Sequence, residues 1–372
     1  MQPVSHSGSE RLVVVCGPTA TGKTGLAVDL ARALGGEIVG ADSRQVYRHM
    51  DVGTAKPTPA QRARAPHHLI DVVDPDEPFT LADYLDRARA AVVDIQARGR
   101  VPLVVGGTGL YVRALVRGFD VPRVPPNPAL RRELEQLAGA EGAGALLERL
   151  RRADPAAAAT VDKDNPRRLI RAIEVAEDTL GAQAFADAAR LPIVSPLLGA
   201  RASSPPTVAS MPTDVGAPTT GAGETLALPG TGKMPALPGH SQGYDALIIG
   251  LTADRAVLHE RADRRVDAMM AEGFLDEVRG LYTRGYAPDL PALSSLGYRE
   301  LGEHLRGRVS CDDATQATKW ATHRFIRRQL TWFRREPDIR WFDITEESVA
   351  DEAMRLVERW LSAPTARAVR SA

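Results

Sequence analysis

The chain is short of cysteine and of long apolar runs. Cys16 and Cys311 are the only cysteines among 372 residues, which is too few for a disulfide framework or a zinc site. No apolar run approaches the length of a membrane span, about 18 residues. The N-terminus also lacks a basic region followed by a long apolar core. We therefore expect a cytoplasmic protein without a membrane span.

The formal net charge of the chain is zero. The 47 Lys and Arg residues balance 47 Asp and Glu residues, which argues against nucleic-acid binding unless the charge is segregated along the chain. A hydrophobic content of 44% and a charged content of 25% are typical of a globular protein. The length exceeds one average core, so we expect two lobes or one core with insertions.

The sequence does contain a phosphate-binding loop pattern, between the apolar run 12–16 and a helix expected over 25–34. Its residues are Gly17, Pro18, Thr19, Ala20, Thr21, Gly22, Lys23 and Thr24. Backbone N–H groups at such a turn bind phosphate. Lys23 adds a charge, and Thr24 can hold Mg²⁺. The alternative is a purely structural strand-to-helix turn.

Two further apolar runs deliver polar residues to the same edge of the expected sheet. Asp42 follows the run 37–41, and Thr108 lies in a glycine turn after the run 101–105. Ligands bind at the carboxyl ends of such strands; the alternatives are a helix N-cap for Asp42 and a purely structural glycine turn. In many hydrolases an acid that holds Mg²⁺ ends this strand. Its absence indicates that the bound phosphates are not hydrolysed in the usual way.

Composition divides the chain into segments. We expect an α/β core over 11–121, a helical lobe over 122–194 that opens on a proline-rich hinge, and the rest of the core over 244–345. The segment 195–243 is rich in proline and glycine and has no aromatic residue, so we expect a disordered insert. Residues 346–372 should form a closing helix and a tail. Further helices are expected over 80–98, 130–138, 143–152, 166–180 and 255–272.

Basic residues cluster in three segments, although the net charge of the whole chain is zero. Such local basic patches are typical of proteins that bind nucleic acid. One is the stretch 319–335, which has six Lys and Arg residues, no acid, and four interleaved Trp and Phe residues. For two further patches, solvated helix surface is the alternative. The other two patches are Arg167, Arg168 and Arg171, and Arg261, Arg264 and Arg265. The adjacent His67 and His68 have no partner at helical spacing, so we expect no metal there.

The ordered set of motifs resembles the tRNA dimethylallyltransferases (tRNA isopentenyltransferases). The resemblance runs from about residue 11 to 345, interrupted only by the insert, and rests on the stretches 17–24, 42–47, 50–57, 66–75, 105–111, 168–174, 297–299 and 327–332. It implies a P-loop NTPase-like parallel sheet flanked by helices, with an inserted all-helical tRNA-binding lobe. It also implies transfer of a dimethylallyl group from dimethylallyl diphosphate to the N6 amine of the adenosine 3′ of the anticodon, with release of pyrophosphate.

The resemblance assigns expected roles. The loop 17–24 and Arg265 would bind the diphosphate, with Mg²⁺ on Thr24 as cofactor, although such loops are otherwise typical of nucleotide- and ATP-binding proteins. Asp42 would accept a proton from the amine, with Thr108 beside it, while Lys23 and Arg265 neutralise the leaving group. The anticodon stem-loop would contact Asp42, Ser43, Arg44, Gln45, Arg131, Arg167, Arg168, Leu169, Ile170, Arg171, Ser294, Ser295, Leu296, Gly297, Tyr298 and Arg299. We expect a monomer with no membrane partner.

Three rival functions remain. A prenyltransferase acting on free adenine nucleotide would need neither the helical lobe nor the basic stretch. A small-molecule kinase would not release pyrophosphate, and a nucleotide-switched binding protein would carry Asp-x-x-Gly after its third strand.

The sequence departs from the family pattern in one place. In relatives a Thr/Ser-Gly-Lys turn follows the helix that begins near 166. Here the candidate is the tripeptide 231–233, inside the insert, and chance is the alternative.

Overall fold

The computed structural model describes residues 11–190 and 243–364. The expected insert lies outside the described residues, apart from Gly243, and so does the tripeptide 231–233. The described chain divides into two compact units, of which one contains residues 11–121 and 243–364 and the other contains residues 122–190. The division falls at the proline-rich segment where a hinge between lobes was expected.

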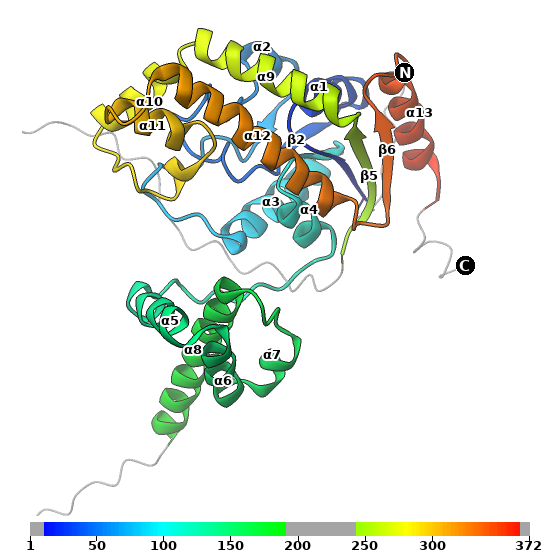
Figure 1. The fold of residues 1–372 in the computed structure, drawn as a ribbon. Coiled ribbons are helices and arrows are strands. Elements are labelled where there is room, and N and C mark those ends of the chain that lie inside the picture. Colours follow the sequence, from blue (N-terminus) through cyan, green and yellow to red (C-terminus); the bar gives the residue numbers. More distant parts are fainter. Residues whose placement is uncertain (1–10, 191–242, 365–372) are drawn as a thin grey trace, which may run out of the picture. The chain divides into compact units, whose positions relative to one another are not determined.

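A parallel sheet forms the centre of the first unit (Figure 1). Its strand order is β3-β2-β4-β1-β5-β6, and all neighbouring strands pair in parallel. The expected parallel sheet is therefore confirmed, but the short β3 and the last strand β6 were not predicted. The strands are β1 (Arg11–Cys16), β2 (Glu37–Gly40), β3 (His67–His68), β4 (Pro102–Gly106), β5 (Asp245–Thr252) and β6 (Ile339–Asp343).

Helices cover both faces of this sheet, because alternate residues of a strand point to opposite faces. On one face Leu12 and Val14 pack with α3 (Leu81–Ala97) and α4 (Gly109–Val116). On the other face Val13 and Val15 pack with α1 (Lys23–Leu34) and α13 (Val349–Ser362). The central strand is thus buried on both sides, which explains its continuous apolar run.

The remaining helices of this unit lie beyond the carboxyl ends of the strands and around the segment that follows Asp42. The longest two, α9 (Arg255–Ala271) and α12 (Cys311–Phe333), pack on each other. A separate apolar cluster joins α10 (Phe274–Thr283) and α11 (Tyr298–Leu305) to Val46 and Met50. The short elements are α2 (Pro59–Arg64) and the 3₁₀ turn Ala292–Ser294. Within the described residues no helix is long and apolar enough to cross a membrane.

The second unit is helical in its described part. Its elements are α5 (Pro128–Glu141), α6 (Ala143–Ala153), α7 (Pro155–Thr160) and α8 (Pro166–Arg190). They bury Leu134, Leu146, Leu150, Leu169 and Ile173 in a core of their own. Three of these helices were predicted. The short α7 was not, although Asp154 before Pro155 is a capping signal, and its side chain accepts a hydrogen bond from the N–H of Ala157.

Candidate active site

The loop between β1 and α1 is shaped for an anion. Gly17 has φ +134°, and a Cβ at this position would lie 2.4 Å from the carbonyl oxygen of Leu251, so the position requires glycine. Gly22 takes the left-handed conformation before α1, and no side chain of the described residues caps the first turn of that helix. The first backbone N–H groups of α1 therefore remain available to a bound anion.

Side chains hold this loop in place. The Nζ of Lys23 donates a hydrogen bond to the carbonyl oxygen of Pro18 at 2.6 Å, and the hydroxyl of Thr21 donates to the same oxygen at 2.9 Å. From α9, the Nε of Arg261 donates to the carbonyl oxygen of Ala20 at 3.0 Å. The loop is thus organised by contacts within the chain itself.

Lys23, Arg265 and Asp42 share one electrostatic environment. Burial, and after it the charge of Arg265, lowers the pKa of Lys23 to about 8, while Asp42 and Cys16 oppose this shift. Burial also lowers the pKa of Arg265, again opposed by Asp42. Two partly buried cations thus face one carboxylate, so an anionic ligand such as a diphosphate would stabilise their charged forms.

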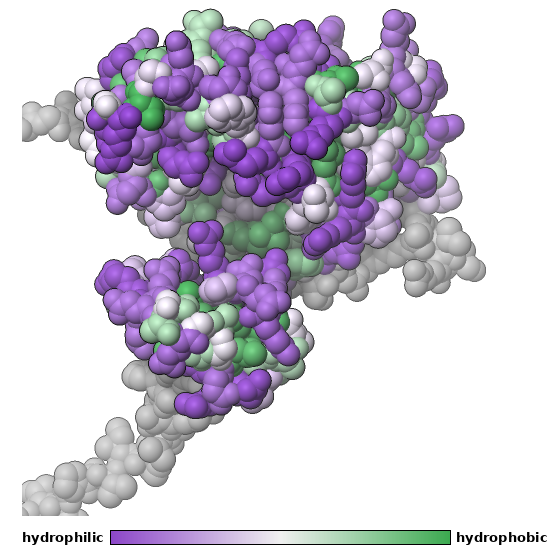
Figure 2. All heavy atoms as spheres, in the orientation of Figure 1, coloured by the Kyte–Doolittle hydropathy of each residue, from purple (hydrophilic) through white to green (hydrophobic). Residues whose placement is uncertain are grey.

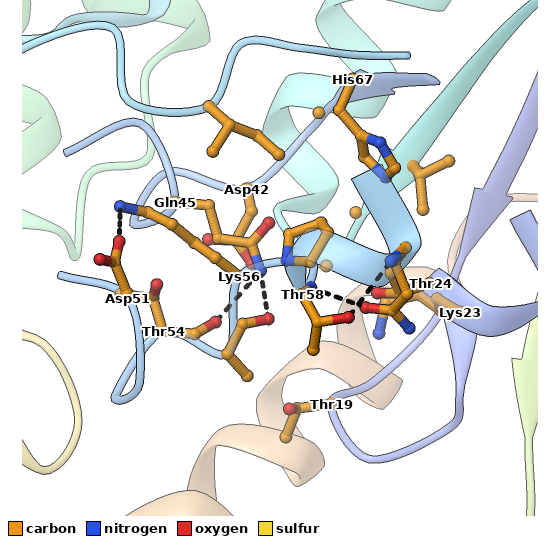
Figure 3. A pocket seen from close by; sticks show the side chains of 18 of the residues that line it. Thr19, Lys23, Thr24, Asp42, Gln45, Asp51, Thr54, Lys56, Thr58 and His67 are labelled. Atoms are coloured by element: carbon orange, nitrogen blue, oxygen red, sulfur yellow. Dashed lines mark hydrogen bonds and ion pairs between the residues drawn. The ribbon is translucent and has the colours of Figure 1, made fainter. Parts of the chain in front are cut away.

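Asp42 follows β2 at the carboxyl edge of the sheet. Its Oδ1 accepts a hydrogen bond from the backbone N–H of Arg44 at 2.8 Å. Residues 43–46 form turns rather than a helix, so the interpretation of Asp42 as a helix N-cap is wrong. The carboxylate instead closes this turn and lines the larger cavity together with Lys23 and Thr24 (Figure 3).

The glycine turn after β4 packs directly against this segment. The Oγ1 of Thr108 accepts a hydrogen bond from the backbone N–H of Ser43 at 3.0 Å, and its own N–H donates to the carbonyl oxygen of Ala41 at 3.1 Å. A Cβ on Gly106 would lie 2.0 Å from that same oxygen. The strand ends in glycine because two backbones approach closely here.

Gln329 of α12 joins the phosphate-binding loop to the glycine turn. Its Oε1 accepts a hydrogen bond from the N–H of Thr19 at 2.9 Å, and its Nε2 donates to the carbonyl oxygen of Gly107 at 2.9 Å. The side chain is buried. Sequence reasoning does not reveal this role, because nothing in a basic helix predicts hydrogen-bond partners 310 and 222 residues away.

Two cavities meet at these residues. The larger, of about 1160 Å³, is lined by Lys23 and Thr24 of the loop (Figure 3). The smaller, of about 430 Å³, is lined by Ser43 and Thr108. Asp42 and Arg265 therefore lie where a ligand on the phosphate-binding loop and a ligand in the smaller cavity would meet. The residues that line both cavities are Thr19, Asp42, Thr54, Gly107, Arg265, Met269, Phe325 and Gln329.

The expected RNA-contacting residues near the sheet differ in exposure. Ser294, Ser295 and Leu296 line the smaller cavity, and Arg299 is exposed. Tyr298 is fully buried in the apolar cluster beside α10, so a contact from its side chain to RNA is contradicted by its burial. Tyr298 instead anchors the segment 294–299 to this cluster, and Gly297 also packs against Phe274 there.

Arg44 and Gln45 are held by backbone carbonyl groups. The Nη1 of Arg44 donates to the carbonyl oxygen of Pro291 at 2.8 Å. The Nε2 of Gln45 donates to those of Thr54 and Ala55 at 3.1 and 3.0 Å. Arg44 lines the smaller cavity and Gln45 the larger one. Both side chains thus reach the site from the turn that follows Asp42.

In the helical unit, the expected RNA-binding residues fall into three groups. Arg131 binds the buried Glu174 through two hydrogen bonds of 2.8 Å. Burial, the largest single influence, would raise the pKa of Glu174, but the hydrogen bonds from Arg131, Asn127 and Arg171 and the charge of Arg131 together lower it. Leu169 and Ile170 are buried in the core, so the expected contacts from their side chains to RNA are contradicted.

The remaining arginines of this unit differ from one another. The Nη2 of Arg171 donates a hydrogen bond to the carbonyl oxygen of Val124 at 2.9 Å. This bond connects the proline-rich segment before α5 to α8. Arg167 and Arg168 are exposed, and Arg168 pairs with Asp162 at 3.1 Å. Exposed ion pairs of this kind contribute little to stability. These two side chains are therefore the best placed of the group to bind a phosphate.

Across the residues that the structure describes, no cluster of three or more His, Cys, Asp or Glu side chains is arranged to hold a metal ion. The Nδ1 of His67 lies 2.8 Å from the carbonyl oxygen of Ala65, and the Nε2 of His68 lies 2.7 Å from a carboxylate oxygen of Glu37. Thr24, whose hydroxyl is the oxygen expected to bind Mg²⁺, lines the larger cavity together with Asp42 and Asp51. This suits Mg²⁺ carried by substrate phosphates and water rather than by a protein cage.

A phosphate-binding loop, a carboxylate at the sheet edge and two adjoining cavities define a group-transfer site on a parallel α/β fold. A family model described as IPP transferase matches residues 45–206 and 219–336, and one described as isopentenyl transferase matches residues 10–69. The chain belongs to the IPP transferase family. The resemblance inferred from the motifs is confirmed.

Named relatives agree with this assignment. The tRNA dimethylallyltransferase of Roseiflexus sp. (strain RS-1) is 44% identical over 95% of this chain and 99% of its own. That of Roseiflexus castenholzii is 47% identical over 88% of this chain and 91% of its own. Among solved structures, the tRNA isopentenylpyrophosphate transferase of Bacillus halodurans has a TM-score of 0.62 and 34% identity, covering 95% of this chain and 97% of its own. A eukaryotic dimethylallyltransferase acting on tRNA, 22% identical with a TM-score of 0.68 over 96% of this chain and 81% of its own, shares the fold.

Proposed function

We propose that this protein transfers a dimethylallyl group from dimethylallyl diphosphate to the N6 amine of the adenosine 3′ of the anticodon in tRNA, with release of pyrophosphate. The observation that carries the proposal is the position of Asp42 and Arg265 at the junction of two cavities, one of which contains the phosphate-binding loop. The diphosphate would occupy the larger cavity and the acceptor base the smaller one. Family membership and the names of the relatives support the same reaction.

The leaving group would be stabilised by the loop. As the C–O bond breaks, negative charge grows on the pyrophosphate, and the backbone N–H groups before α1, together with Lys23 and Arg265, would neutralise it. Preorganised charges and dipoles commonly lower the barrier of such reactions more than any other single effect. Mg²⁺ fits as a cofactor bound to Thr24 and to phosphate oxygens, where it would supply further positive charge. The bond breaks at carbon, so no water has to be activated at phosphorus.

The acceptor would be activated by Asp42. The lone pair of an adenine amine is delocalised into the ring, so the amine loses a proton as the new C–N bond forms, and a carboxylate at the cavity junction can accept it. The hydroxyl of Thr108, held by Ser43, would orient the amine. The base must leave the anticodon stack to enter the smaller cavity, as for other enzymes that act on a base.

Substrate binding by the whole chain is part of the proposal. We expect the exposed Arg167 and Arg168 of the helical unit to bind phosphates of the stem-loop, and Ser294–Leu296 and Arg299 to contact the RNA near the cavity. We propose that the active form is a monomer. Because tRNA is the acceptor, the enzyme would work in the cytoplasm without a membrane partner.

The test is to mix the protein with Mg²⁺, radiolabelled dimethylallyl diphosphate and either bulk tRNA or AMP, and to measure both label transfer and pyrophosphate release. Labelled tRNA with equimolar pyrophosphate is the expected result. Labelled AMP without labelled tRNA would assign a free nucleotide as acceptor. Transfer of phosphate from ATP to a small molecule, without pyrophosphate, would assign a kinase instead.

A further inference from the structure

The solvent-facing side of α12 carries an exposed tryptophan among arginines. Trp320 is 57% exposed, the highest fraction among the large apolar side chains of the described residues. Arg324, Arg327 and Arg334 are also exposed and follow it at spacings of four, three and seven residues. Arg334 directly follows the last residue of α12 and keeps a right-handed helical conformation, so all four lie on one side of the helix axis. We call these four residues the α12 outer face. They extend over about 20 Å at 1.5 Å per residue.

The charge of this face is not neutralised within the described chain. The sequence holds no Asp or Glu between Asp313 and Glu336. None of the three arginines has a carboxylate within 4.0 Å among residues 11–190 and 243–364, whereas Lys319, on another side of the same helix, pairs with Asp267 at 2.6 Å. Figure 2 shows hydrophilic side chains along the path of α9 and α12. A row of unpaired arginines fits a polyanion.

The opposite side of the same helix lines the smaller cavity. Thr318, Thr322, Phe325 and Gln329 contribute to its wall and lie about half a turn from the outer face, at 100° per residue. Arg328 lies between the two sides and also lines the cavity, with its guanidinium 5.7 Å from the ring centroid of Phe325. One helix thus connects the cavity proposed for the acceptor base to an arginine row on the surface.

We propose that the α12 outer face is an RNA-docking surface, on which nucleotides flanking the modified adenosine place their phosphates on Arg324, Arg327 and Arg334 and stack a base on Trp320. The inference rests on the proposed function, because it takes the substrate to be tRNA. Unpaired nucleotides need both a cationic groove and an aromatic platform, and stacking on an aromatic side chain tolerates any base. An anionic lipid surface would use the charge, but a 20 Å helix side with a single aromatic residue offers it little apolar area to bury.

The experiment measures equilibrium binding of full-length protein to unmodified bulk tRNA as a function of salt, without dimethylallyl diphosphate. One variant is Arg324→Gln with Arg327→Gln, and a second is Trp320→Ala. Arg328 is left unchanged because it lines the cavity. The matched control is Arg355→Gln with Arg359→Gln on α13, which removes the same charge from two other exposed arginines.

The double variant on α12 should weaken binding about tenfold at moderate salt and reduce the slope of log K against log[salt] by about 1–2, because two phosphate contacts are lost. Trp320→Ala should weaken binding about tenfold without changing the slope. The control should bind like the unchanged protein, and kcat at saturating tRNA should stay within about twofold in all variants. Circular dichroism checks that each variant folds.

Equal affinities and slopes for the α12 variants and the control would overturn the inference. So would loss of binding to vesicles containing phosphatidylserine, at unchanged tRNA affinity, since that result assigns the face to a membrane. The two proposals fail separately. If the unchanged protein labels tRNA but the α12 variants bind normally, only the docking surface is wrong; if the unchanged protein does not label tRNA, the proposed function is wrong.

Discussion

Replacing Gln329 with leucine should loosen the contact between the phosphate-binding loop and the glycine turn. The amide accepts a hydrogen bond from the N–H of Thr19 and donates one to the carbonyl oxygen of Gly107, both at 2.9 Å. Leucine fills a similar volume but can do neither. A backbone donor and a backbone acceptor would thus lose their partners at a buried position, and leaving such a group unsatisfied costs about 1–3 kcal/mol.

The two losses together predict a decrease of about 2–5 kcal/mol in the free energy of unfolding, reduced where water reaches the part-buried N–H of Thr19. For domains of 150–250 residues, each kcal/mol corresponds to about 2–4 °C in Tm. We therefore expect Gln329→Leu to lower Tm by about 4–20 °C. Because Thr19 belongs to the loop itself, the affinity for inorganic pyrophosphate should also fall, by about tenfold.

Differential scanning calorimetry and isothermal titration with pyrophosphate measure the two effects. The control is Gln316→Leu, the same substitution on an exposed side of the same helix, which should change the free energy of unfolding by less than about 0.5 kcal/mol. If both variants melt at the same temperature, Gln329 does not join the two loops. If Gln329→Leu lowers the melting temperature but leaves the pyrophosphate affinity unchanged, the contacts of Gln329 do not shape the anion site.

Three further predictions concern the proposed reaction. Asp42→Asn should lower kcat by about 10²–10⁴ with little change in tRNA or diphosphate affinity; more than a tenth of the original rate would remove Asp42 as proton acceptor. Because Lys23 has a lowered pKa of about 8 and binds an anion only when protonated, pyrophosphate affinity should fall as pH rises through 8. Arg265→Gln removes one cause of that shift, so titration calorimetry should find the fall at higher pH; an unchanged pH would contradict the coupling. Arg167→Ala with Arg168→Ala should raise KM for tRNA and leave KM for dimethylallyl diphosphate unchanged, and steady-state kinetics that show equal effects on both would refute the assignment.

The parts of the fold that sequence predicts are those with local signals. The phosphate-binding loop has fixed glycine spacing, and the sheet strands around it are continuous apolar runs bounded by glycine or polar residues. The two-residue β3 has no periodicity to detect, and it exists because β2 supplies its partner through Ile38 and Val39. The strand β6 reads Ile-Arg-Trp-Phe-Asp and is recognisable only through its pairing with β5.

The candidate site was predicted in the same uneven way. Backbone-shaped features such as Gly17 and the turn at Thr108 follow from residue type, but the partners of polar side chains depend on the folded chain. Leu169 and Tyr298 show the converse error: a motif contains residues that build the fold beside residues that contact a ligand, and only burial separates them. Gln329 belongs to the same class of motif residues, and its two partners could not be predicted from sequence.

Glu277 offers a last test of how the larger cavity is built. Its carboxylate accepts hydrogen bonds from the N–H groups of Asp51 and Val52, both at 2.7 Å, from that of Gly53 at 3.1 Å, and from the hydroxyl of Tyr298 at 2.6 Å. Burial, and after it the charge of Glu277, raises the pKa of Tyr298 well above its usual range, so the phenol remains a donor.

Replacing Glu277 with glutamine puts an NH₂ group, which cannot accept, in place of one carboxylate oxygen. At least one charge-assisted bond is lost, at about 1.5–3 kcal/mol each, and the loop 51–55, which lines the larger cavity, should open. Asp276→Asn is the matched control, because both acids lie in the first turn of α10 and interact alike with the helix dipole. We expect Glu277→Gln to lower Tm by at least about 3 °C more than the control and to speed proteolysis in the loop 51–55. Equal melting temperatures of the two variants would show that Glu277 stabilises the fold through the helix dipole and not through its hydrogen bonds to the loop 51–55.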